Sequence, residues 1–131
     1  MIDGATALVV MSRERRLPLV EILEPLTLSV LTAGDCREAR ALLQTRPPLE
    51  IVIIDVSLMD GNWCDIFKFL VDYEISASVV VASGSADERL WSEVLWRGAY
   101  DLLVEPYERE EVQRVLEGAL KIGRASCRER V

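Results

Sequence analysis

The chain has 131 residues, of which 50% are hydrophobic and 28% are charged, as expected for one soluble globular domain. Its formal net charge of −7 argues against nucleic-acid binding by this domain. No apolar run approaches the roughly 20 residues of a membrane span, and the N-terminus lacks the pattern of a secretory signal, so we expect no membrane association and a cytoplasmic location. The three cysteines have no CxxC spacing and histidine is absent, which argues against a zinc site.

Short apolar runs alternate along the chain with stretches whose apolar residues recur at helical spacing. In chain order, the sequence predicts strands at residues 5–11, 28–32, 51–54, 78–83 and 100–104, each followed by a helix. The first helix is expected at residues 15–24, with Pro18 near its start and Pro25 after its end. Asp35 and Ser85 have the positions of N-caps for the second and fourth helices, each with a glutamate three residues later in capping-box register.

Five strands that alternate with five helices predict a parallel sheet, covered by helices on both faces and joined by right-handed crossovers. The third strand, residues 51–54, is rich in β-branched residues and has no polar interruption, which is typical of a strand buried on both faces. Asp55 follows it directly. Open α/β sheets place their binding crevices at the carboxyl ends of such strands, so Asp55 is the first candidate for a functional residue.

The C-terminal segment KIGRASCRERV resembles the translation of a sequencing adapter rather than natural coding sequence. We therefore divide the chain into a domain at residues 1–121 and a tail at residues 122–131 that is left out of the fold prediction. A genuine basic tail is the alternative. On the adapter interpretation, an output domain could follow residue 121 in the natural protein.

Three segments carry a resemblance to a known family, and each falls on the matching predicted element. DVSLMDGNW follows the third strand, VVVASGSADERL covers the fourth strand and the start of its helix, and RGAYDLLVEPYEREEV spans the fifth strand. Over residues 5–120 the sequence resembles the receiver domain of two-component response regulators. The resemblance implies a flavodoxin-like (βα)5 fold with sheet order 2-1-3-4-5. It also implies that Asp55 accepts a phosphoryl group from a histidine kinase and that Ser83 is the switch hydroxyl, although a serine that caps a turn at the strand end is the alternative for Ser83.

The positions that support phosphoryl transfer in receivers differ in this chain. The family binds Mg²⁺ with an acidic pair after the first strand, and the matching residues are Met11 and Ser12, neither of which offers the carboxylate oxygens that Mg²⁺ prefers. Glu105 stands where the family has a lysine before a proline. One unit charge at about 4 Å is worth roughly 4 kcal/mol at an effective dielectric near 20, and about 1.36 kcal/mol changes a rate tenfold. The sequence therefore predicts a degenerate phosphorylation site, at which transfer is slow or absent, with no metal or other cofactor.

Nearby charges suggest two other arrangements around Asp55. Arg13 follows the first strand and is a candidate salt-bridge partner, which would hold Asp55 in one fixed state without phosphate. Alternatively, Asp55, Glu105 and Glu14 form a rearranged acidic site for a cation.

The fourth helix carries Trp91 and Trp96 next to several aliphatic residues, and one helix cannot bury all of them on a single face. A tryptophan on the outer face would suit a partner surface, because aromatic residues dominate interface hot spots. Ordinary partial burial is the alternative. The resemblance points to the same region, since receivers commonly form homodimers or bind their outputs through the fourth helix, fifth strand and fifth helix.

We therefore predict a receiver-like signalling domain, not an enzyme, that acts through contacts with a histidine kinase or another signalling protein. The first alternative is a working receiver, phosphorylated on Asp55, at the N-terminus of a longer response regulator. The second alternative is a flavodoxin-like enzyme or nucleotide binder. It is disfavoured because no Gly-rich phosphate loop follows the first strand and no histidine is present for acid–base catalysis.

Overall fold

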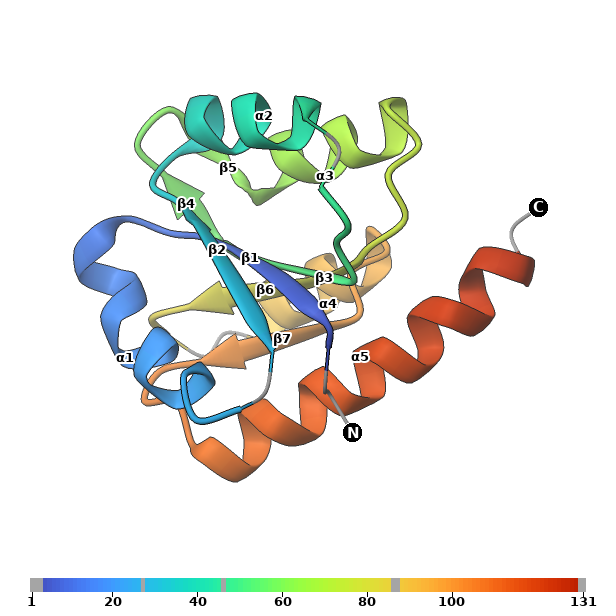
Figure 1. Cartoon of the computed structure of the whole chain (residues 1–131). Coiled ribbons are helices and arrows are strands. Elements are labelled where there is room, and N and C mark those ends of the chain that lie inside the picture. The colour runs from blue at the N-terminus through green and yellow to red at the C-terminus, as the bar shows by residue number, and fades with distance from the viewer. Residues whose placement is uncertain (1–3, 27, 46, 86–87, 130–131) are drawn as a thin grey trace.

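A five-stranded parallel sheet forms the centre of the computed structural model (Figure 1). The structure describes residues 4–26, 28–45, 47–85 and 88–129, and the side chains of these residues up to 121. The strands of the sheet are β1 (Thr6–Val10), β2 (Ser29–Ala33), β3 (Ile51–Asp55), β6 (Ser78–Ser83) and β7 (Asp101–Val104). Their order is β2-β1-β3-β6-β7, and since β6 and β7 are the fourth and fifth strands of this sheet, the predicted flavodoxin-like order 2-1-3-4-5 is confirmed.

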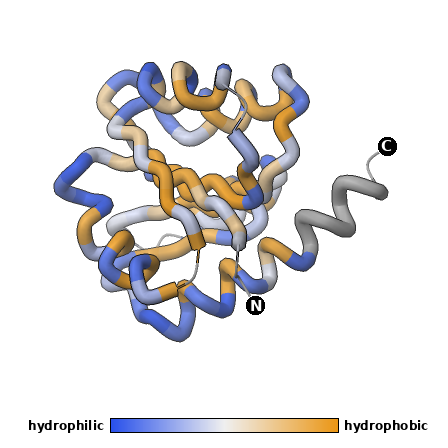
Figure 2. Tube along the Cα trace, in the orientation of Figure 1, coloured by the Kyte–Doolittle hydropathy of each residue, from blue (hydrophilic) through white to orange (hydrophobic). Residues whose placement is uncertain are grey.

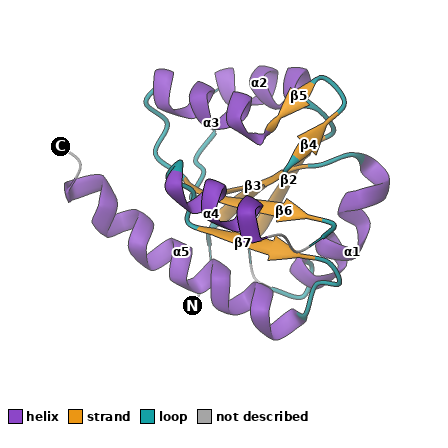
Figure 3. Cartoon of the chain, turned by 180° about the vertical axis from the view of Figure 1, so that it is seen from behind, coloured by secondary structure: helices purple, strands orange, loops and turns teal. Residues whose placement is uncertain are grey.

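Helices cover both faces of the sheet, as Figures 1 and 3 show from opposite sides. The helices are α1 (Arg13–Leu23), α2 (Cys36–Gln44), α3 (Trp63–Asp72), α4 (Glu88–Trp96) and α5 (Arg109–Glu129). α1 and α5 pack against one face, and α2, α3 and α4 pack against the other. The fold is therefore three layers, with two separate hydrophobic clusters on either side of one sheet.

The strand residues supply both clusters in alternation. In β3, Ile51 and Ile53 face the α1/α5 side, whereas Val52 and Ile54 face the α2/α3/α4 side. Successive side chains of a strand point to opposite faces, so a strand between two helix layers has to be apolar at every position. Figure 2 shows the result as a hydrophobic sheet at the centre and hydrophilic residues on the outer sides of the helices.

α1 begins at Arg13, so the prediction of a helix at residues 15–24 is wrong at its N-terminal end. Ser12 is the N-cap, although its side chain makes no capping hydrogen bond, and Pro18 lies inside the helix. The earlier start places Arg15 in the first helical turn. This position decides which arginine reaches the functional site.

The N-cap predicted at Asp35 is confirmed, because its carboxylate accepts a hydrogen bond from the Glu38 backbone N–H at 2.8 Å. The Glu38 carboxylate accepts from Gly34 N at 2.6 Å, so the reciprocal bond is made one residue before the N-cap. The box predicted at Ser85 includes residues 86–87, which lie outside the described residues.

A short antiparallel hairpin follows β3 and was not predicted. It consists of β4 (Ser57–Leu58) and β5 (Gly61–Asn62). Asn62 also caps α3, because its Oδ1 accepts from Cys64 N at 2.9 Å and from Asp65 N at 3.4 Å. The Asp65 carboxylate accepts from Asn62 N at 3.0 Å, which completes a capping box between Asn62 and Asp65. The hairpin therefore leads directly into α3.

The last helix, α5, continues to Glu129 and so includes most of the segment that we interpreted as a tail. Among the residues whose side chains the structure describes, Leu120 is the last one of this helix that is buried in the core. The division of the chain at residue 121 stays a prediction. Within the described ranges, no helix has both the length and the apolar character needed to cross a membrane.

Candidate functional site

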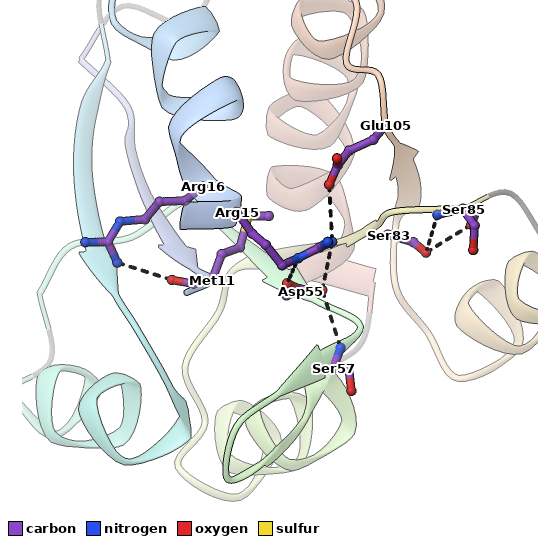
Figure 4. Close-up of polar contacts among 8 residues, drawn as sticks. All are labelled: Met11, Arg15, Arg16, Asp55, Ser57, Ser83, Ser85 and Glu105. Carbon is purple, nitrogen blue, oxygen red and sulfur yellow. Dashed lines mark hydrogen bonds and ion pairs between the residues drawn. The ribbon is translucent and has the colours of Figure 1, made fainter. Parts of the chain in front are cut away.

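The candidate site lies at the carboxyl edge of the sheet, around Asp55 (Figure 4). Asp55 is the last residue of β3 and is 2% exposed. β3 lies between β1 and β6 at the centre of the sheet, so its end is surrounded by the loops that follow three strands. A carboxylate buried to this degree needs a counter-charge or hydrogen-bond donors.

Arg15 provides that counter-charge. Its Nε donates to Asp55 Oδ2 at 2.6 Å and its Nη2 donates to Asp55 Oδ1 at 3.4 Å. Nη2 also forms an ion pair with Glu105 Oε1 at 3.3 Å, so one guanidinium bridges two carboxylates that come from the ends of β3 and β7. The backbone N–H of Ser57 makes a further contact with Asp55 Oδ1, at 3.4 Å. Figure 4 shows these groups converging between the strand ends.

The prediction that Arg13 pairs with Asp55 is wrong, because Arg15 takes this role. Consecutive residues of an α-helix are about 100° apart around its axis, so residues two apart point in nearly opposite directions. Arg13 is exposed, whereas Arg15 is partly buried against the sheet edge. Arg15 lies four residues before the buried Leu19, so the helical spacing places it on the inner face of α1. That its partner there is Asp55 is seen only in the tertiary structure.

The charges of this cluster reinforce one another. The hydrogen bond to Asp55, together with the negative charges of Asp55 and Glu105, raises the pKa of Arg15 above its already high ordinary value. The hydroxyl of Tyr107 is buried nearby and has no hydrogen-bond partner among the described groups. Burial and the charge of Glu105 raise the pKa of Tyr107 to about 12, so this phenol is neutral and adds no charge to the cluster.

The positions that match the metal ligands of receivers are occupied by groups that do not fit Mg²⁺. Met11 is fully buried in the cluster on the α1/α5 side, and its carbonyl oxygen accepts a hydrogen bond from Arg16 Nη1 at 3.2 Å. Ser12 is exposed at the start of α1. Mg²⁺ requires near-octahedral coordination by oxygen atoms, usually from one or two carboxylates. Here the carboxylates of Asp55 and Glu105 already contact Arg15.

The alternative cation site of Asp55, Glu105 and Glu14 has no support in the geometry. Throughout the part of the chain that the structure describes, no group of three or more His, Cys, Asp or Glu residues is arranged to hold a metal ion. Glu14 is exposed on the first turn of α1. The positive group between Asp55 and Glu105 is an arginine side chain.

Ser83 is the last residue of β6 and is 3% exposed. Its hydroxyl donates to the carbonyl oxygen of Ser85 at 3.0 Å and accepts from Ser85 N at 3.3 Å. These local bonds close a turn at the strand end, as the alternative interpretation of this serine expects. A role of Ser83 as a switch hydroxyl stays a prediction.

The two tryptophans of α4 are on the outer side of the helix, while Val94 is fully buried beneath them. Trp96 is 88% exposed and Trp91 is 49% exposed. The expectation that α4 cannot bury all its apolar residues agrees with these values.

Sequence comparison finds response regulators. Over 107 residues the chain is 28% identical to response regulator protein PilR of Pseudomonas aeruginosa, a match that covers 79% of this chain and 23% of PilR. Over 85 residues it is 31% identical to the photosynthetic apparatus regulatory protein RegA of Cereibacter sphaeroides, covering 65% of this chain and 46% of RegA. The matched part is thus less than half of each of these two relatives. No protein-family model matches the sequence.

Structure comparison finds receiver domains with the same fold. A response regulator receiver domain protein from Clostridium thermocellum superposes with a TM-score of 0.81 over 92% of this chain and 98% of that chain, at 20% sequence identity. A match at this identity shows the fold. The chain therefore has the fold of receiver domains, and its sequence is similar to response regulators of two-component systems.

Proposed function

We propose that this receiver domain signals through contacts with other proteins, and that phosphoryl transfer to Asp55 is slow or absent. The observation that carries the proposal is the ion pair between Arg15 Nε and Asp55 Oδ2 at 2.6 Å. An acceptor carboxylate has to be free to attack phosphorus, whereas both oxygens of Asp55 accept hydrogen bonds from Arg15. The pair has to open before a phosphodonor can approach.

The charge at residue 105 adds to this barrier. A phosphoryl group in transfer carries negative charge on its oxygens, and active sites neutralise it with metal ions and cationic side chains. Glu105 brings a carboxylate to within 3.3 Å of the same guanidinium that binds Asp55. A barrier increase of about 3 kcal/mol, less than the roughly 4 kcal/mol of one charge at about 4 Å, slows transfer about 100-fold.

Incubation with acetyl phosphate and Mg²⁺, followed by intact-mass measurement, tests this proposal. We expect the wild-type mass to stay unchanged under conditions that phosphorylate a receiver with a complete acidic pair and lysine. The Asp55→Ala variant is the control for modification at other residues. A gain of one phosphoryl group in the wild type that disappears in Asp55→Ala would contradict the proposal and favour a working receiver.

We further propose that the outer face of α4 is a contact surface for a second copy of the domain. The supporting observation is the exposure of Trp96, at 88%, because exposed tryptophan is unusual outside interfaces. Sedimentation velocity over a range of protein concentrations should show self-association that Trp96→Ala weakens. Met59→Ala is the matched control, since Met59 is 94% exposed on the β4–β5 hairpin. A protein that stays monomeric at every concentration would contradict self-association.

A further inference from the structure

We infer that Arg15 takes the place of the divalent cation that the receiver family implies, so that the folded site needs no metal. This inference deepens the proposed function, because it assigns a reason for the impaired chemistry at Asp55. Receivers collect negative charge at the carboxyl edge of the sheet and balance it with Mg²⁺. In this chain the balancing positive charge is the guanidinium of Arg15, a side chain of α1.

The first argument is charge balance. The Asp55 side chain is 3% exposed, and its nearest cation is the Arg15 guanidinium, with Nε at 2.6 Å from Oδ2. The same guanidinium contacts Glu105 Oε1 at 3.3 Å. A delocalised planar cation with several donors suits this role, since it can serve two carboxylates at once without the coordination geometry that Mg²⁺ demands.

The second argument is space. A Cβ atom built on Gly84 would lie 3.3 Å from Arg15 Nη1 and 3.6 Å from Arg15 Nη2. The guanidinium therefore lies beside Gly84, next to the space that a side chain at residue 84 would enter, while it also contacts Asp55. A metal ion at Asp55 would have to displace this group.

The third argument concerns the remaining oxygen atoms at the edge. The carbonyl of Met11, at the end of β1, already accepts a hydrogen bond from Arg16 Nη1 at 3.2 Å. The Met11 side chain is fully buried in the hydrophobic cluster and offers sulfur rather than oxygen. Arg15 and Arg16, which are consecutive in α1, thus each donate to an acceptor at one of two neighbouring strand ends.

The consequence is that divalent cations should not affect the wild-type protein, and should affect a variant that lacks Arg15. Removal of the guanidinium leaves the carboxylates of Asp55 and Glu105 without their shared counter-charge. If a divalent cation binds these two carboxylates in the folded protein, a cation concentration of about ten times the dissociation constant raises the ratio of folded to unfolded protein about elevenfold.

Thermal unfolding at constant ionic strength, in Mg²⁺ or in EDTA without phosphodonor, tests the inference. We expect equal midpoints for the wild type, and a midpoint for Arg15→Ala that is several degrees higher in Mg²⁺ than in EDTA. Arg13→Ala is the matched control, because it removes the same charge from an exposed position on the same helical turn and should behave as the wild type. Arg15→Gln keeps most of the side-chain volume and should respond to Mg²⁺ as Arg15→Ala does.

Two results would overturn the inference. One is a wild-type midpoint that rises in Mg²⁺ as much as that of Arg15→Ala, and the other is a folded Arg15 variant that shows no response. If both Arg15 variants fail to fold, electron paramagnetic resonance of Mn²⁺ added to the wild type still decides, because bound Mn²⁺ that is released by Asp55→Asn contradicts the inference and free Mn²⁺ supports it. Since no phosphodonor is present, these outcomes are independent of whether Asp55 can be phosphorylated.

Discussion

Two arginines in the first turn of α1 have different surroundings, and the difference shows how one residue defines the site. Arg15 bonds the buried carboxylate of Asp55, and Arg13 is exposed. Loss of one partner from a fully buried ion pair costs about 3–5 kcal/mol, whereas exposed pairs contribute about 0–1 kcal/mol. Because the Arg15 side chain is 39% exposed, water can reach the pair and its loss should cost less than in a dry interior.

We therefore expect Arg15→Ala to lower the free energy of unfolding by about 1–3 kcal/mol, between these two limits. Arg13→Ala should change it by less than about 0.5 kcal/mol, as surface substitutions usually do. Urea denaturation of both variants provides the measurement. Equal losses for the two variants would show that net charge, not the specific ion pair, is responsible.

Asp60 makes a different contribution, which depends on pH. Its carboxylate accepts from Cys36 N at 2.8 Å and from Arg37 N at 3.0 Å, at the N-terminus of α2. The hydrogen bond from Cys36 N is the main cause that lowers the pKa of Asp60 below its ordinary value. A carboxyl group whose pKa is lower in the folded state stabilises the fold above its unfolded pKa, about 3.9, and loses this effect as the pH falls through the lower folded pKa.

Asp60→Asn should therefore unfold at a lower urea concentration than the wild type at pH 7, and the difference should disappear at a pH well below about 3.9. Asp72→Asn is a suitable control, since Asp72 is exposed at the C-terminal end of α3, where a negative charge is unfavourable. That control should not destabilise the protein. A loss in Asp60→Asn that stays constant across the pH range would exclude the carboxylate charge as its cause.

At the scale of elements, the β4–β5 hairpin connects the functional strand to two helices. Asp60 in its turn caps α2, and Asn62 at its end caps α3. Gly61 lies between these contacts. A Cβ atom at residue 61 would lie 2.5 Å from Asp65 Oδ2 and 2.9 Å from Cys36 Sγ, which is closer than real Cβ atoms approach. The hairpin can pack against both helices because this position has no side chain.

Gly61→Ala should consequently reduce the free energy of unfolding by about 1–3 kcal/mol, the usual cost of overpacking. Gly34→Ala serves as its control, because the nearest atom to a Cβ there is Glu38 Oε1 at an ordinary 3.7 Å. Replacement of glycine at such a compatible position is neutral or stabilises by about 0.4–1 kcal/mol. Chemical denaturation of the two variants checks the contrast, and similar stabilities would contradict the close contact at residue 61.

At the scale of the whole molecule, two hydrophobic clusters share one sheet. Ile53 belongs to the cluster beneath α1 and α5, whereas Trp63 is 2% exposed in the cluster beneath α2, α3 and α4. Neither face of β3 can lose its packing without affecting the strand that carries Asp55. We expect the domain to unfold as one cooperative unit.

Ile53→Val removes one methylene from the α1/α5 side and should cost about 0.5–1.5 kcal/mol. The loss should appear equally in circular dichroism and in tryptophan fluorescence, although the buried tryptophan lies on the opposite face of the sheet. Parallel urea titrations followed by both signals provide the measurement. A fluorescence transition that stays at the wild-type midpoint would show that the two faces unfold independently.

The sequence by itself determined the alternation of strands and helices, the double-sided burial of β3 and the position of Asp55 at its end, because these depend on local periodicity. The strand order was expected only from the resemblance to receiver domains. Met11, Ser12 and Glu105 could also be assigned to the strand ends from the sequence. The hairpin escaped prediction because each of its strands has two residues, too few for an alternating pattern. Tertiary structure alone decided that Arg15 pairs with Asp55. That contact joins residues 40 positions apart in the sequence. Which arginine reaches Asp55 depends on the angular position of each arginine around α1, and this angle changes by about 100° with every residue.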